Sequence, residues 1–112
     1  RELSVLEPFG KGNEKPLFAE KNLSILNMKI LGRNRNVLKM QVRSQSGTVM
    51  DALYFGDAEE FLDYYREKYG AEEVDALLCG RPQQMRFAFT YYPQINSYQG
   101  ITSIQIVVTH YA

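Results

Sequence analysis

The stretch from Lys21 to Phe55 limits most strongly what this chain can fold into, because apolar and polar residues alternate along it. A period of two is typical of half-buried β-strands, whose successive side chains point to opposite faces of a sheet. The turn-forming sequence Gly-Arg-Asn-Arg-Asn at 32–36 separates the first strand from the second, and Ser-Gln-Ser-Gly at 44–47 precedes a third. The sequence therefore predicts three consecutive strands joined by short turns.

The alternation assigns an inner and an outer face to each strand. In the first two strands, the residues expected to face a core are apolar: Leu26, Met28, Ile30, Leu38, Met40 and Val42. The outer face of these two strands is expected to carry Lys29, Lys39, Gln41 and Arg43. In the third strand we expect Met50, Ala52 and Tyr54 inside, and Asp51, Leu53 and Phe55 outside.

Basic residues are concentrated in the first part of the chain. The formal net charge is zero, but residues 1–48 hold nine Lys/Arg and four Asp/Glu, whereas residues 49–112 hold four and nine. Between Lys21 and Arg43 there are six basic residues and no acidic one. Such asymmetry concentrates positive potential on one surface, which we interpret as a wall that faces nucleic acid. The alternative is that these charges only solubilise the strands.

Helix signals follow the third strand. Asp57 is a good N-cap with Glu60 three residues later, Gly70 is a stop signal, and a second short helix is expected from Glu72 to Cys79. The outer face of the first helix is acidic, and Cys79 is expected to be a small buried residue. Alternation then resumes around Phe87–Tyr92 and Ser103–Thr109, which predicts two more strands, with a polar loop at Pro93–Gly100 between them.

This order of elements predicts the fold class. Three strands, a helical insertion and two further strands make up an OB-fold, a mostly β, five-stranded Greek-key barrel with its helix between strands 3 and 4. Another small α+β fold or an SH3-like barrel is the alternative. We divide the chain into a lead-in segment, 1–18, which contains a Pro-Phe-Gly-x-Gly-Asn loop, and an OB-fold domain, 19–112. The abrupt start without methionine suggests a piece excised from a longer chain.

Catalytic and metal-binding groups are scarce in this sequence. With a single histidine, His110, and a single cysteine, Cys79, the chain offers no internal disulfide, no Cys- or His-based metal site and no conventional Ser-His pair. We therefore expect neither a catalytic centre nor a cofactor in this chain. No apolar run approaches the roughly 18 residues of a membrane span, so we expect no membrane partner and a cytoplasmic location.

The predicted ligand is single-stranded DNA, which is bound by cations that follow its phosphates and aromatic rings on which its bases stack. In an OB-fold the ligand face is formed by the second and third strands and two flanking loops. Of the alternating pair Tyr91 and Tyr92, one is expected to be exposed, and we include Tyr92. The predicted nucleic-acid-binding residues are Lys29, Arg33, Arg35, Lys39, Gln41, Arg43, Phe55, Tyr92, Asn96 and Tyr98.

Several short motifs resemble one known family. The sequence Leu-Glu-Pro-Phe-Gly-Lys-Gly-Asn at 6–13, followed by Pro16, resembles the Leu-x-Pro-Phe-Gly-x-Gly-Asn-x-x-Pro signature of RecJ, a single-strand-specific 5′→3′ DNA exonuclease family. Asp-Ala-Leu-Tyr-Phe-Gly at 51–56 and Ile-Asn-Ser-Tyr-Gln-Gly at 95–100 are similar to later motifs of that family. The chain departs from the family pattern at Glu14, Ser97 and Gln99, where proline, an acidic residue and asparagine are usual.

The resemblance implies an OB domain that lies outside the Asp-His-His catalytic core and grips single-stranded DNA for it. The implied partners are single-stranded DNA and the catalytic core of the parent chain, where Mg or Mn would be bound. This fragment is then expected to be inactive and monomeric by itself. The alternative is a protein-interaction or intramolecular docking module that uses Phe9, Leu17, Phe18 and the acidic helix. Nuclease activity of this chain by itself is disfavoured because it lacks metal ligands.

Overall fold

The computed structural model describes residues 3–6 and 16–112. The Pro-Phe-Gly-x-Gly-Asn loop falls outside the described residues. The described elements are, in chain order, β1 (Leu3–Leu6), β2 (Leu17–Leu31), β3 (Val37–Arg43), β4 (Val49–Phe55), α1 (Ala58–Tyr69), α2 (Ala71–Leu78), β5 (Phe87–Tyr98) and β6 (Ile101–Tyr111). The predicted division at residue 18 stays a prediction, although β2 begins at Leu17 and β1 pairs with it.

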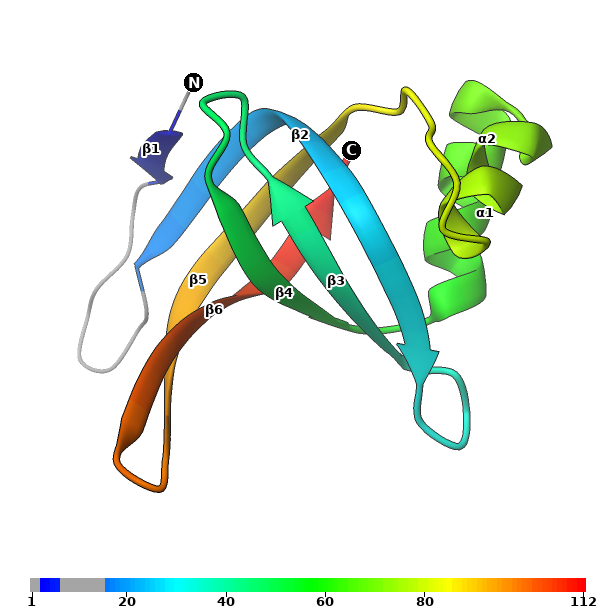
Figure 1. Ribbon diagram of the computed structural model, residues 1–112. Helices are drawn as coiled ribbons and strands as arrows, with labels where there is room; N and C mark the ends of the chain where they lie inside the picture. The colour runs from blue at the N-terminus through cyan, green and yellow to red at the C-terminus, as the bar shows by residue number, and fades with distance from the viewer. Residues whose placement is uncertain (1–2, 7–15) are drawn as a thin grey trace.

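Strands β2 to β6 form a closed barrel (Figure 1). The strand order is β1-β2-β3-β4-β6-β5, and an additional pairing between β2 and β5 closes the ring. All neighbours are antiparallel except β4 and β6, which run parallel. The helices lie between the third and fourth barrel strands in sequence, so the predicted OB-fold is confirmed. Strand β1 adds to the first part of β2, outside the ring.

Strand β2 contains two irregularities, which change which of its residues face the core. The register shifts between Glu20 and Leu23 and again between Ile25 and Asn27. An extra residue in a strand reverses the inward and outward assignment beyond it. As a result Leu23 and Ile25 are buried, and Leu26, which was expected to face the core, is 44% exposed. Strand β3 has no such shift, and its predicted inner residues are all buried: Leu38, Met40 and Val42.

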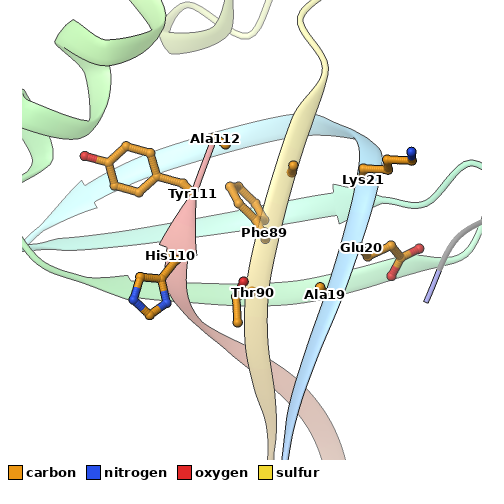
Figure 2. A pocket seen from close by; sticks show the side chains of 9 residues that line it. Ala19, Glu20, Lys21, Phe89, Thr90, His110, Tyr111 and Ala112 are labelled. Atoms are coloured by element: carbon orange, nitrogen blue, oxygen red, sulfur yellow. The ribbon is translucent and has the colours of Figure 1, made fainter. Parts of the chain in front are cut away.

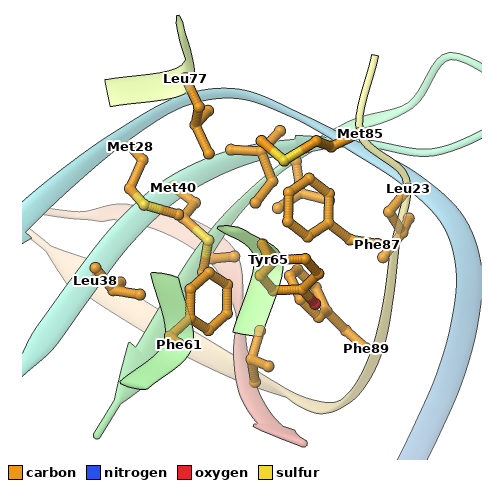
Figure 3. Packing of buried hydrophobic residues seen from close by; sticks show 14 of the residues in the cluster. Leu23, Met28, Leu38, Met40, Phe61, Tyr65, Leu77, Met85, Phe87 and Phe89 are labelled. Atoms are coloured by element: carbon orange, nitrogen blue, oxygen red, sulfur yellow. The ribbon is translucent and has the colours of Figure 1, made fainter. Parts of the chain in front are cut away.

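Helix α1 closes one end of the barrel with aromatic side chains. Phe61 and Tyr65 are buried between the strands, close to Phe87 and Phe89 (Figure 3). The Phe61 ring centroid lies 4.7 Å from that of Tyr111, and the Tyr65 hydroxyl donates a hydrogen bond of 2.9 Å to the carbonyl of Ala112. Burial raises the pKa of the Tyr65 phenol above its ordinary value, so the ring stays neutral and keeps this donor.

Helix α2 contributes less to the core than α1. Val74 and Leu77 are buried, as their spacing predicts. Cys79, in contrast, is exposed rather than buried. It is the C-cap of α2, and a residue that follows the last helical turn leaves the stripe that faces the core.

The segment Pro93–Gly100 is a β-hairpin and not the loop that its polar composition predicts. Strand β5 extends to Tyr98, and only Gln99 and Gly100 form the turn. Both turn residues have positive φ, 50° and 79°, as two-residue hairpin turns require. The hairpin extends beyond the barrel (Figure 1), so Ile104 pairs with Ile95 where both are exposed.

The N-cap of α1 provides a test of the fold. The Asp57 carboxylate accepts hydrogen bonds from the backbone N–H groups of Glu59, at 2.9 Å, and Glu60, at 3.2 Å. We expect Asp57→Ala to lower the free energy of unfolding by about 1 kcal/mol, because those donors lose their acceptor. Urea denaturation measures this change. Asp57→Asn keeps an acceptor oxygen and should restore most of the loss, and equal stability of all three proteins would contradict the assignment.

Candidate functional site

Two lysines face each other on the outer surface of β2 and β3. The strand register aligns one row of residues across the barrel: Lys29, Lys39, Leu53, Val107 and Tyr92, which we name the lysine row. Directly paired residues on neighbouring strands point to the same face. Lys29 and Lys39 are exposed, and neither has an ion pair with any residue that the structure describes. The lysine row therefore begins with two adjacent positive charges.

The next row along the strands is polar. It consists of Asn27, Gln41, Asp51, Gln105 and Gln94, which we name the amide row. The Asn27 side-chain amide donates to Gln41 Oε1 at 2.8 Å, and the Gln105 amide donates to Gln94 Oε1 at 2.7 Å. A shallow groove runs between the two rows and is lined by Asn27, Lys29, Lys39, Met40, Gln41 and Asp51. Such a groove offers cations on one side and hydrogen-bonding groups on the other.

An exposed aromatic residue stands at one end of this face. Phe55, the last residue of β4, is 60% exposed and pairs with Val37, which in turn pairs with the exposed Leu31. The loop 32–36 follows directly and presents Arg33, which is exposed and has no ion pair within residues 16–112. An exposed flat ring is suited to stacking an unpaired base, and an exposed guanidinium is suited to contacting a phosphate.

Arg35 has a different role from its neighbour. Its guanidinium lies 2.8 Å from the Glu59 carboxylate on α1, and its carbonyl accepts a hydrogen bond from the Ala58 N–H at 3.2 Å. The carbonyl of Asn36 likewise accepts from the Gly56 N–H at 3.0 Å. These contacts fix the loop 32–36 against the start of α1. The structure thus gives Arg35 a partner within the domain, whereas Arg33 is presented to solvent.

The other predicted residues lie on two separate parts of the surface. Arg43 is exposed at the end of β3, beyond the amide row. Tyr92 is half-buried in the lysine row, because its neighbour Tyr91 is the buried one and donates a hydrogen bond of 3.1 Å to Glu20. Asn96 and Tyr98 occupy register positions opposite Ser103 and Ile101, far along the β5–β6 hairpin. Figure 1 shows the tip of this hairpin on the opposite side of the barrel from the loop 32–36.

Four residues of the amide row were not among the predicted site residues. Alternation already placed Asp51 on the outer face, and Asn27 lies two residues before Lys29 in the same strand, so the sequence held enough signal to include both. Gln94 and Gln105 come from the fourth and fifth barrel strands, and only the parallel pairing of Asp51 with Gln105 brings them to this face. No local pattern in the sequence specifies that pairing.

A second hollow lies where β2, β5 and β6 meet (Figure 2). Its lining includes Glu20, Thr90 and His110, and in Figure 2 the side chains of Glu20 and His110 point apart. Among the described residues, no group of three or more His, Cys, Asp or Glu side chains is arranged to hold a metal ion. No helix in the described part of the chain is long and apolar enough to cross a membrane.

Comparison with known protein families identifies the family of this chain. The family model described as RecJ OB domain matches residues 1–110, almost the whole chain. The match includes both the lead-in segment and the barrel, and it confirms the resemblance drawn from the motifs at 6–13, 51–56 and 95–100. A comparison with curated proteins finds no match to this chain.

The Arg35–Glu59 pair can be measured directly. In a double-mutant cycle of Arg35→Ala and Glu59→Ala, we expect a coupling of about 0.2–1 kcal/mol in the free energy of unfolding, since both side chains are half exposed. The coupling should shrink in about 1 M salt, where surface charges are screened. A cycle of Arg33→Ala with Glu59→Ala is the matched control and should show none. Zero coupling for both arginines would mean that the ion pair does not hold the loop.

Proposed function

We propose that this chain, which belongs to the RecJ OB domain family, binds single-stranded DNA on the outer face of β3 and β4. In this proposal it holds the strand for a metal-dependent nuclease core of the same enzyme. The family match and the closed OB barrel support a nucleic-acid-binding role, since OB-folds use this face for oligonucleotides. The chain itself would then be inactive, and Mg or Mn would be needed only in the core.

The observation that carries the proposal is the pairing of Lys29 with Lys39. Like charges placed directly opposite each other on neighbouring strands destabilise a sheet. Within the described residues no carboxylate forms an ion pair with either ammonium group. A DNA phosphate bound between the two lysines would relieve their repulsion, so the free domain carries an electrostatic cost that its ligand removes.

The remaining groups on this face fit a single strand with its bases turned toward the protein. Phosphates would contact Lys29 and Lys39 on one side of the amide row and Arg43 on the other side, while the base edges between them would lie over the amide row. The Asp51 carboxylate repels phosphate but can accept a hydrogen bond from a base N–H group. Phe55 would stack one base at the end near Arg33, and a stacked base is worth roughly 1–3 kcal/mol.

The second candidate function is docking onto another protein surface, in particular the catalytic core. The observation that favours it is a group of exposed isoleucines on the β5–β6 hairpin: Ile95 and Ile104, which pair across the two strands, and Ile101 near the tip. The other residues proposed for docking contribute less, because the Phe18 ring is half-buried and stacked 6.0 Å from Tyr91, and Phe9 falls outside the described residues. A cytoplasmic location and a monomeric state of the isolated domain stay predictions.

The decisive experiment measures fluorescence anisotropy of a labelled single-stranded oligonucleotide with the double variant Lys29→Ala/Lys39→Ala. Each phosphate contact on single-stranded DNA contributes about −0.7 to the log–log salt slope, so loss of two should reduce the slope by about 1.4. The same relation gives roughly 10- to 50-fold weaker binding at about 0.1 M salt. The unmodified chain, with about three to six phosphate contacts, should show a slope of roughly −2 to −4.

The matched control is Arg66→Ala/Arg81→Ala, which also removes two basic side chains but leaves this face intact. Its affinity should stay within about twofold of the unmodified chain, because charges on remote surfaces are screened. Equal losses of affinity in the two double variants would mean that the lysine row contributes only non-specific positive charge. No binding to single-stranded DNA even at low salt would refute the proposal and favour docking.

Removal of the Asp51 charge should have the opposite effect to removal of the lysines, because it should strengthen DNA binding. Asp51→Asn removes the negative charge beside the groove and should tighten binding to a thymine oligonucleotide. The expected gain is about two- to fivefold, which corresponds to the Coulomb energy of one charge pair in a medium of high dielectric constant. Thymine offers only its ring N3–H as a donor, and the amide oxygen introduced by Asp51→Asn can still accept from it, so that hydrogen bond is kept. Asp63→Asn, on the outer surface of α1, is the control. Unchanged affinity for Asp51→Asn would place the strand away from the amide row.

A further inference from the structure

A polar cleft lies where strand β2 bends around the edge of the barrel. The two register shifts of β2 lie on either side of Leu23–Ile25, and Asn22, within the first shift, has a positive φ of 60°. A left-handed conformation is uncommon outside glycine, although asparagine tolerates it, and such conformations concentrate at functional sites. The cleft beside this bend is lined by Asn22, Ser24, Arg43, Ser44, Gln45 and Arg86.

The lining contains two arginines and no carboxylate. Neither Arg43 nor Arg86 forms an ion pair with any residue in the described part of the chain. One guanidinium nitrogen of Arg86 donates to the carbonyl of Met85 at 3.1 Å, which leaves its other N–H groups for a ligand. The side chains of Asn22, Ser24 and Gln45 add amide and hydroxyl donors. This set of donors is suited to an anion with several oxygens.

The walls of the cleft are held in place by hydrogen bonds. The Ser44 hydroxyl is buried and accepts from the Thr48 N–H at 3.1 Å, which fixes the turn beside Gln45. The Tyr69 hydroxyl donates to the carbonyl of Arg86 at 2.9 Å, and the Gln83 amide donates to the carbonyl of Ile25 at 2.8 Å. A preorganised set of donors loses less conformational entropy when it binds a ligand.

The register connects this cleft to the outer face of β3. Arg43 pairs with Ser24 across β2 and β3, and on the other edge of β2, Leu23 pairs with Phe87, the residue after Arg86. The cleft therefore continues the basic surface from Arg43, past the bend of β2, to the start of β5. Guanidinium groups bind phosphate oxygens in a bidentate manner, which favours a phosphate group as the ligand.

We propose that the cleft between Arg43 and Arg86 binds a phosphodiester group of the DNA strand where that strand leaves the outer face of β3. This inference rests on the proposed function and deepens it, because it extends the path of the strand to β5. Arg43 then serves both the outer face and the cleft, and Arg86 serves the cleft alone. Substitution of Arg86 is therefore the clean test.

The experiment measures anisotropy of thymine oligonucleotides of about 5 and about 15 nucleotides, within the range of OB-fold site sizes, with Arg86→Ala. For the longer oligonucleotide we expect about fivefold weaker binding at about 0.1 M salt and a salt slope reduced by about 0.7, the value of one phosphate contact. The short oligonucleotide occupies the outer face alone and should bind unchanged. Arg86→Lys should recover part of the affinity, because it keeps the charge but not the planar fork.

Arg81→Ala is the matched control, since Arg81 is also exposed on the connection between α2 and β5 but does not line the cleft. Equal affinities of Arg86→Ala and Arg81→Ala would overturn the proposal that the cleft binds the strand. Equal losses of affinity for both oligonucleotide lengths would overturn it as well. If Lys29→Ala/Lys39→Ala weakens binding and Arg86→Ala does not, only the cleft is refuted. If the unmodified chain binds no single-stranded DNA, the proposed function and the cleft are both refuted.

Free phosphate would use the same donors, and a further measurement separates it from the strand. Chloride is replaced by inorganic phosphate at constant ionic strength while the longer oligonucleotide is bound. A site for a phosphodiester held by the rest of the strand should show little phosphate-specific competition. Strong competition in the unmodified chain that disappears in Arg86→Ala would assign the cleft to free phosphate and overturn the proposed path.

Discussion

The parallel pairing of β4 with β6 is the constraint on which the rest of the structure depends. It joins Asp51–Tyr54 to Gln105–Val108 and converts an open sheet into a barrel. Without it both strands would have an unpaired edge, which folded proteins avoid by closure or covering. Parallel neighbours need a long crossover, and the segment with α1, α2 and β5 supplies it. The same pairing places Gln105 beside Asp51, so closure of the fold also completes the amide row.

The helical crossover links the core to the candidate site. Phe61 and Tyr65 fill one end of the barrel, and the first turn of the same helix presents Glu59 to Arg35. The loop 32–36 therefore cannot move independently of the helix that seals the core. Its position leaves Arg33 in solvent beside Phe55, at the end of the face where β4 finishes. In this way the packing of α1 against the core fixes the geometry of the exposed loop 32–36.

Much of this fold could be predicted from the sequence, and the errors have physical causes. Alternation succeeded in β3 because that strand has no register shift, but it failed at Leu26, where the second register shift of β2 reverses its faces. The polar residues of 93–100 indicated a loop, whereas the left-handed pair Gln99 and Gly100 lets the strands pair up to the turn. Local pattern identified Lys39 and Arg43 as outward. It could not find the partner of Arg35, the Gln94–Gln105 part of the amide row or the cleft at Arg86, which depend on contacts between distant segments.

A net charge of zero limits how this domain can attract a polyanion. Long-range steering needs a large uncompensated field, and here the acidic face of α1 offsets the basic strands at distances beyond the Debye length of about 10 Å. In the proposed function, the affinity for DNA therefore comes from short-range contacts at particular positions, such as the Lys29–Lys39 pair and the two arginines of the cleft. Because each phosphate contact on a single strand contributes only modestly to the binding free energy, neighbouring contacts along the strand can be exchanged one at a time. A neutral barrel with a narrow basic path is therefore suited to holding a strand that has to move, more than to trapping it.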